Sequence, residues 1–187
     1  MIEQFLKRIA KGLDRQGIPY IIIGGQAALI HGRPRLTEDV DVTLGIDTDE
    51  FPKLFEECRN LKLTPLRANP EEFAEKTKVL PMQDPESKLR VDFIFSNTPY
   101  EQVAIKRAVL VEMADYPVRF ASPEDLVIHK LFAGRAIDLE DAEAVLLRQG
   151  NKLDRAYVRK WLKVFGTTEE GKDLLTVWSR LPKPGEK

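Results

Sequence analysis

The sequence has 187 residues, of which 43% are hydrophobic and 32% charged; this indicates one compact domain, alone or with a helical appendage, and excludes a chain disordered over most of its length. The formal net charge of -1 gives no overall attraction for nucleic acid, and the single cysteine, Cys58, excludes an internal disulfide and a cysteine-rich zinc site. No apolar run approaches the roughly 20 residues needed to cross a bilayer, and the charged N-terminal segment is unlike a secretory signal, so we expect a cytoplasmic protein without a membrane partner.

Helix and strand patterns alternate at the start of the chain. Apolar residues at helical spacing predict an amphipathic helix over residues 2–16, and a β-branched run predicts a buried strand over 20–23 that ends at a glycine pair. A short helix is expected over 26–31. The alternation of polar and apolar residues over 39–44 then predicts a half-buried strand.

The middle of the chain has less regular patterns, and residues 63–68 fit neither a helix nor a strand clearly. Pro85 lies in a polar stretch and predicts a hairpin between two strands. The expected elements are, in order, helices at 49–58 and 70–76, a hairpin whose strands hold residues 79–80 and 89–95, and short strands at 109–112 and 118–120.

The pattern becomes helical after residue 121. Ser122 is suited to cap a helix, and Pro123 to occupy its first position. Helices are expected from there to about residue 133 and over 139–149, 155–165 and 169–180. We therefore predict a mixed α+β fold, in which residues 1–121 form a small twisted sheet flanked by helices and residues 122–187 form a helical region packed on it.

Aspartates on two predicted strands carry the strongest functional signal. Alternate residues of a strand face the same way, so Asp39 and Asp41 present carboxylates side by side, with Cα atoms roughly 6.5 Å apart. Asp92 repeats this arrangement on a later strand and would join them if the two strands were neighbours. Three carboxylates suit magnesium, with manganese as an alternative, because such an ion completes its shell with phosphate oxygens. An acidic, solvent-facing sheet surface is the alternative explanation.

A glycine pair precedes this strand. Gly24 and Gly25 lie between a predicted strand and a predicted helix start, where backbone N–H groups can approach a triphosphate without obstruction by a Cβ atom. An ordinary tight turn is the alternative explanation.

The combination of these pieces resembles a known superfamily. The pieces are Ile23-Gly24-Gly25, thirteen intervening residues, Asp39-Val40-Asp41 and the later Val91-Asp92-Phe93. Together they resemble the nucleotidyltransferase superfamily related to DNA polymerase beta. Further segments are similar to the AbiEii-type toxins and their minimal relatives, namely residues 24–27, 31–33, 35–41, 123–126, Lys130 and 134–141. Ile137 replaces a lysine that those proteins usually have.

The resemblance implies a nucleotidyltransferase-type sheet and a role for individual residues. The catalytic and metal-binding residues would be Asp39, Asp41 and Asp92, and the nucleotide-binding residues Gly24, Gly25, Gln26, Arg35 and Lys130. Asp92 would serve as a metal ligand or as the general base for the acceptor hydroxyl.

Alternatives stay open for several of these side chains. Lys130 either reaches the triphosphate or snorkels from an amphipathic helix. Arg35 either steadies the phosphates or pairs with a neighbouring acidic residue. Asp138 and Asp141 are expected to orient Lys130 or Arg135.

The predicted reaction is transfer of a nucleoside monophosphate from a nucleoside triphosphate to a hydroxyl acceptor. The AbiEii resemblance implies an RNA 3′ end or a protein as acceptor, and a toxin role beside an antitoxin. The alternatives are an aminoglycoside-like adenylyltransferase that acts on a small molecule, and a catalytically silent module that binds a nucleotide or a partner. Arg155, Arg159 and Lys163 recur on one predicted helix and either receive an RNA acceptor or form a solvated face.

Overall fold

The chain divides into two compact units in the computed structural model, which describes residues 1–34, 37, 39–169, 171 and 173–183. The first unit consists of Met1–Ile23 and Thr37–Phe120, and the second of Gly24–Leu36 and Ala121–Lys187. The segment 24–36 thus groups with the C-terminal helices, which the linear sequence pattern does not reveal.

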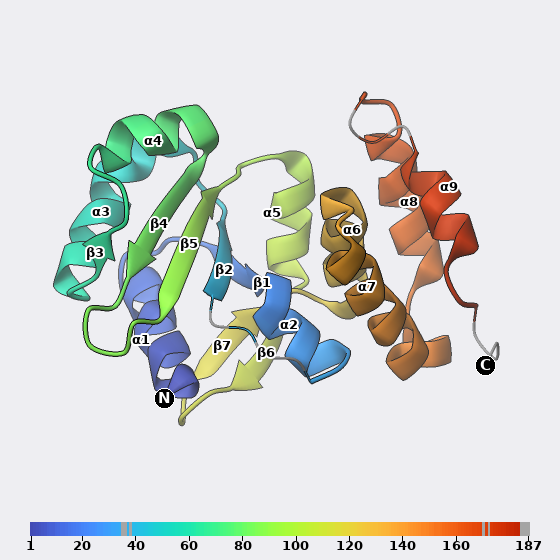
Figure 1. Ribbon diagram of the computed structural model, residues 1–187, viewed down its shortest axis with the longest axis horizontal. Helices are drawn as coiled ribbons and strands as arrows, with labels where there is room; N and C mark the ends of the chain where they lie inside the picture. The colour runs from blue at the N-terminus through green and yellow to red at the C-terminus, as the bar shows by residue number, and fades with distance from the viewer. Residues whose placement is uncertain (35–36, 38, 170, 172, 184–187) are drawn as a thin grey trace. The chain divides into compact units, whose positions relative to one another are not determined.

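The first unit is built on a mixed sheet with seven strands among the described residues, in the order β3-β4-β5-β2-β1-β7-β6 (Figure 1). The strands are β1 (Tyr20–Ile23), β2 (Asp39–Leu44), β3 (Thr64–Pro65), β4 (Val79–Gln83), β5 (Arg90–Phe95), β6 (Val109–Glu112) and β7 (Pro117–Phe120). Strand β2 runs antiparallel to β1 and parallel to β5, while β7 runs parallel to β1. The predicted mixed fold is confirmed, and the ambiguous stretch 63–68 holds only the two-residue strand β3.

Helices of the first unit are α1 (Ile2–Arg15), α3 (Phe51–Asn60), α4 (Pro70–Thr77) and α5 (Pro99–Lys106). Buried Glu57 of α3 joins α3 to α1, because it accepts hydrogen bonds from Arg15 and, at 2.9 Å, from Gln16 Nε2. The helix expected over 49–58 begins later, because a 3-10 turn over Thr48–Glu50, capped by Asp47, comes before α3.

Helix α5 was not predicted from the sequence. Its signal is present, since Pro99 occupies the first turn and the Thr98 side chain accepts a hydrogen bond from the Glu101 N–H. This is the same kind of cap that correctly predicted a helix after Ser122.

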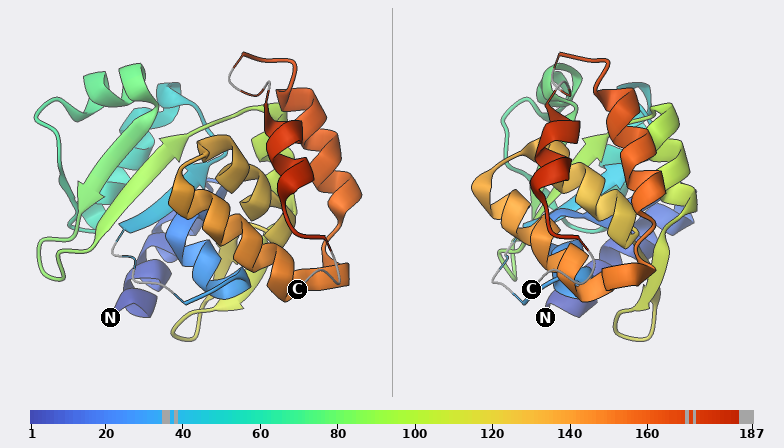
Figure 2. Two further views of the ribbon diagram at one scale, coloured as in Figure 1. Left: turned by 45° about the vertical axis from the view of Figure 1, so that its right-hand side comes forward. Right: turned by 90° about the vertical axis from the view of Figure 1, so that its right-hand side faces the viewer.

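The second unit is helical and consists of α2 (Gly24–His31), α6 (Pro123–Ala133), α7 (Ala136–Gln149), α8 (Arg155–Phe165) and α9 (Leu174–Arg180), with a 3-10 turn over Gly150–Lys152. Helices α8 and α9 lie side by side in both views of Figure 2. Three predicted starts were wrong: α2 begins two residues earlier than expected, α7 three residues earlier and α9 five residues later. No helix among the described residues combines the length and the apolar character that a membrane span requires.

Burial of the alternate residues in β2 and β5 fixes the orientation of both strands. On one face of the sheet the side chains are almost completely buried; these are Val40, Val42, Leu44, Val91, Phe93 and Phe95. The predicted apolar face is confirmed. A shift of either strand by one residue would expose this set, so burial of these side chains holds the register that positions the opposite face.

Candidate active site

The carboxylates of β2 and β5 share one face of the sheet. Asp41 is the Cα partner of Asp92, and Asp39 is the partner of Arg90, in two parallel neighbouring strands. Because paired residues of neighbouring strands point to the same side, these four side chains lie on one face of the sheet. The Arg90 Nε atom lies 3.7 Å from Asp39 Oδ1, which agrees with that placement. The condition that the two strands be neighbours is therefore met.

Asp92 is the most perturbed carboxylate on this face. Its Oδ1 atom is buried and has no hydrogen-bond partner among the described residues. Burial raises the pKa of Asp92; the positive charges of Arg90 and Arg67 oppose this increase, and the negative charge of Asp39 adds to it. An unsatisfied, partly desolvated carboxylate oxygen is costly for the fold, and such groups are typical of functional sites.

The donor chemistry of this face fits a magnesium ion. Carboxylate oxygens are its preferred protein ligands, and Asp39, Asp41 and Asp92 present them on this face. Among the described residues, no three aspartate, glutamate, histidine or cysteine side chains stand close enough together to hold a metal ion. The carboxylates would therefore have to turn toward each other on their shared face to bind one.

Three of the predicted nucleotide-binding residues, Gly24, Gly25 and Gln26, lie at the start of α2. Gly24 has φ of +64°, a left-handed conformation that favours glycine, and it lets the helix begin directly after β1. Gln26 in the first turn is only 5% exposed, and its Nε2 donor has no hydrogen-bond partner among the described residues. A buried, unused N–H donor beside the unpaired N–H groups of a helix start is suited to an anion.

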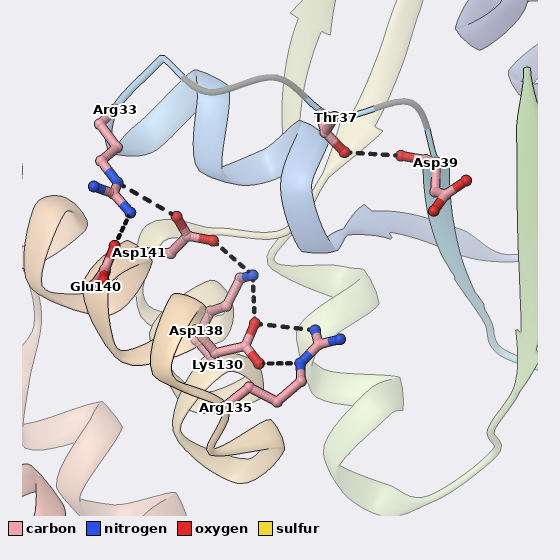
Figure 3. Close-up of polar contacts among 8 residues, drawn as sticks. All are labelled: Arg33, Thr37, Asp39, Lys130, Arg135, Asp138, Glu140 and Asp141. Atoms are coloured by element: carbon pink, nitrogen blue, oxygen red, sulfur yellow. Dashed lines mark hydrogen bonds and ion pairs between the residues drawn. The ribbon is translucent and has the colours of Figure 1, made fainter.

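Lys130 of α6 belongs to a buried ion-pair cluster (Figure 3). Its Nζ atom lies 2.7 Å from Asp138 Oδ1 and 2.8 Å from Asp141 Oδ2, and all three side chains are almost completely buried. The snorkelling alternative for Lys130 is therefore wrong. Asp138 also accepts a hydrogen bond from Arg135 Nε at 2.6 Å, so the two aspartates orient Lys130 and Arg135 as expected.

Arg33 extends this cluster in a way that the sequence did not reveal. Its guanidinium pairs with Glu140 and lies 3.7 Å from Asp141 Oδ1 (Figure 3). Burial alone would raise the pKa of Asp138, but the hydrogen bonds from Arg135 and Lys130 outweigh it and lower that pKa. Arg33 belongs to segment 31–33, which is similar to the AbiEii-type toxins, but only three-dimensional contacts show its partners. Arg35 lies outside the described residues, so its role stays a prediction.

Comparison with known proteins supports a single class. Residues 1–174 match the protein family described as "Nucleotidyltransferase of unknown function (DUF6036)". No curated protein matches the sequence significantly.

Several solved structures have a similar fold. An antigenic nucleotidyltransferase-like protein from Paracoccidioides brasiliensis is 17% identical, with a TM-score of 0.56 over 97% of this chain and 93% of that chain. The antibiotic-resistance factor ANT(2'')-Ia is 14% identical, with a TM-score of 0.59 over 88% of this chain and 91% of that chain. The lincosamide antibiotic adenylyltransferase LnuA is also 14% identical, with a TM-score of 0.51 over 76% of this chain and 94% of that chain. At these identities the likeness shows the fold alone.

Proposed function

Since the chain belongs to the nucleotidyltransferase family DUF6036, we propose that it transfers a nucleoside monophosphate from a nucleoside triphosphate to a hydroxyl acceptor, with the carboxylates of β2 and β5 as its reactive centre. The observation that carries the proposal is the pairing of Asp41 with Asp92 on the face that also holds Asp39.

The three aspartates have different roles in this proposal. Asp39 and Asp41 would hold magnesium, which supplies positive charge at the triphosphate when bound. Asp92 accepts the proton of the acceptor hydroxyl. At the same time the hydroxyl oxygen bonds to the α-phosphorus, and the bond between the α-phosphorus and pyrophosphate breaks. Burial raises the pKa of Asp92, and this makes it a stronger base than an ordinary aspartate.

We assign phosphate binding to the start of α2. The backbone N–H groups of Gly24 and Gly25 and the Nε2 donor of Gln26 would donate hydrogen bonds to phosphate oxygens. This assignment satisfies the orphaned Gln26 donor. Lys130 would position the residues around it and would not contact a phosphate directly, because its ammonium group already pairs with Asp138 and Asp141.

The class of acceptor is to be identified by experiment. RNA 3′ ends, protein hydroxyls and small-molecule hydroxyls are the three classes to compare. Two structural neighbours support the inclusion of the third class, since LnuA was solved with lincomycin bound and ANT(2'')-Ia is an antibiotic-resistance factor.

The test is incubation of the purified chain and magnesium with α-phosphate-labelled triphosphates and each acceptor class. We expect label on one acceptor class, loss of transfer on chelation, and loss in Asp41→Asn. Asp47→Asn is the matched control, because Asp47 is an exposed carboxylate of the same unit that pairs with Lys78. Transfer that persists in Asp41→Asn would contradict the proposal.

Calorimetry separates an enzyme from a silent binding module. We expect magnesium-dependent triphosphate binding that weakens in Asp41→Asn. Binding that survives this substitution unchanged, together with no transfer to any acceptor, would favour the silent module instead.

A further inference from the structure

A groove lies between α8 and α9 of the second unit. These two helices are adjacent in Figure 2. Its volume is about 510 Å³. The lining residues are Arg155, Ala156, Arg159, Leu175, Trp178, Ser179 and Lys183. No role for this groove follows from the carboxylates of β2 and β5, so its function is a separate question.

The described residues that line the groove carry charge of one sign. They include the cationic side chains of Arg155, Arg159 and Lys183 and no acidic side chain, in a protein whose formal net charge is -1. Lys163, which is exposed, continues the row of Arg155 and Arg159 by one more helical turn along α8. From Arg155 to Lys163 the row extends over roughly 12 Å of helix axis. A single small anion cannot contact all of these cations, whereas a chain of phosphates can.

The inner wall of the groove is apolar, and Arg155 lies against it. The Arg155 guanidinium lies over the Trp178 ring, 4.3 Å from its centroid, and its Nη1 atom donates a hydrogen bond to the Pro182 carbonyl at 3.2 Å. Leu175 and Ala156 complete the apolar lining. Arg155 is thus held over an aromatic surface, and a nucleobase can stack on such an arrangement.

We propose that this groove binds single-stranded nucleic acid. The row of cations would contact successive phosphates, and the Arg155–Trp178 stack with Leu175 would receive a base. An acidic peptide would match the charges but would not use the stacked arginine plane. Double-stranded nucleic acid would match the phosphates but keeps its bases paired. Binding here does not depend on the proposed catalytic activity.

Fluorescence anisotropy with labelled single-stranded RNA and DNA of about 12 nucleotides tests the proposal. This length lies within the roughly 4–16 nucleotides that one domain of known single-strand-binding proteins covers. We expect binding by the wild-type chain that weakens with salt, because phosphate contacts release counterions. Arg159→Glu with Lys163→Glu should lower affinity at least about tenfold and reduce the salt dependence. The paired RNA and DNA arms show whether the 2′-hydroxyl contributes.

Lys160→Glu is the matched control, since Lys160 lies on the same helix, is exposed and does not line the groove. Lys160→Glu changes one charge outside the groove and should change affinity less than about twofold. Thermal melting shows whether each variant folds. Arg159→Glu alone should lower affinity more than Lys160→Glu. Equal losses from these two single substitutions would overturn the proposal, because they would indicate attraction by net charge alone. Absence of binding by the folded wild type, or equal competition by polyglutamate, would also overturn it.

Trp178 supplies a readout of location. The chain has two tryptophans, so in a Trp161→Phe background the remaining emission comes from Trp178. An oligonucleotide that binds in the groove should change this emission with the affinity measured by anisotropy. Binding without any change in the emission would place the nucleic acid elsewhere.

Discussion

Asp41 and Asp92 are direct partners in the parallel pairing of β2 and β5, although the chain builds two helices and two strands between them. The pairing places two acidic groups side by side on a sheet whose opposite face is closed by buried apolar residues. Such an arrangement costs stability in the free protein, and the cost itself can be measured.

Asp92→Asn should therefore stabilise the free protein and slow transfer. The folded pKa of Asp92 is raised, chiefly by burial, so the stability that this group contributes is full below its ordinary pKa and is lost as pH rises through the folded value. At neutral pH the ionised group is a net cost that asparagine removes. Thermal unfolding at neutral pH should show a higher midpoint for Asp92→Asn, while transfer should fall at least about 100-fold, as for loss of a general base.

Asp39→Asn is the comparison for that experiment. The Asp39 side chain is 50% exposed and lies at 3.7 Å from Arg90, so its removal should change the free energy of unfolding by less than about 1 kcal/mol. A lower midpoint for Asp92→Asn than for the wild type would show that Asp92 stabilises the fold, against our expectation.

Gln26→Met should separate nucleotide binding from stability. The Gln26 Nε2 donor is buried without a partner among the described residues, so its loss removes no visible hydrogen bond. We expect the free energy of unfolding to change by less than about 1 kcal/mol, and triphosphate affinity by calorimetry to fall about tenfold, as for one hydrogen bond to a charged group. Gln16→Met is the opposite control, since Gln16 bonds buried Glu57 and its loss should lower stability alone.

Lys130→Met should be strongly destabilising. It leaves Asp138 and Asp141 buried without their shared cation, and breaking a buried pair of this kind costs about 3–5 kcal/mol. The Arg135 side chain is 73% exposed, so Arg135→Met should cost less than about 1 kcal/mol. Urea unfolding followed by circular dichroism measures both, and equal losses would show that burial of the cluster does not govern its stability.

His129 should make the protein sensitive to mild acid. Burial lowers the pKa of His129 to about 4, against an ordinary value of 6.5. The unfolded chain therefore takes up a proton between these values that the folded chain does not, and stability is lost as pH falls through this window. The loss from this residue is about 2 kcal/mol at about pH 5, and His129→Gln should remove it. Urea unfolding of both proteins at neutral pH and at about pH 5 gives the difference, which should be close to zero if His129 titrates normally.

The sequence predicted the chemistry of each strand better than the relations between strands. Period-two alternation correctly gave the shared orientation of Asp39 and Asp41 and the apolar face behind them, because that pattern is local. It could not show that β5 pairs with β2, since this depends on the path of the chain between them. The partners of Arg33 were hidden for the same reason, because Glu140 and Asp141 lie far along the chain. Helix α5 was different, since a local cap signal was present and overlooked.

The long chain segment between β2 and β5 also affects the protein while it is being synthesised. Until β5 has left the ribosome, the edge of β2 that it will cover has no neighbour, and an uncovered edge can recruit a strand from another chain. A fragment that stops before Arg90 would keep two of the three acids and expose that edge. Such fragments should aggregate where the whole chain stays dispersed, so the order of emergence makes β5 the element that protects the nascent protein.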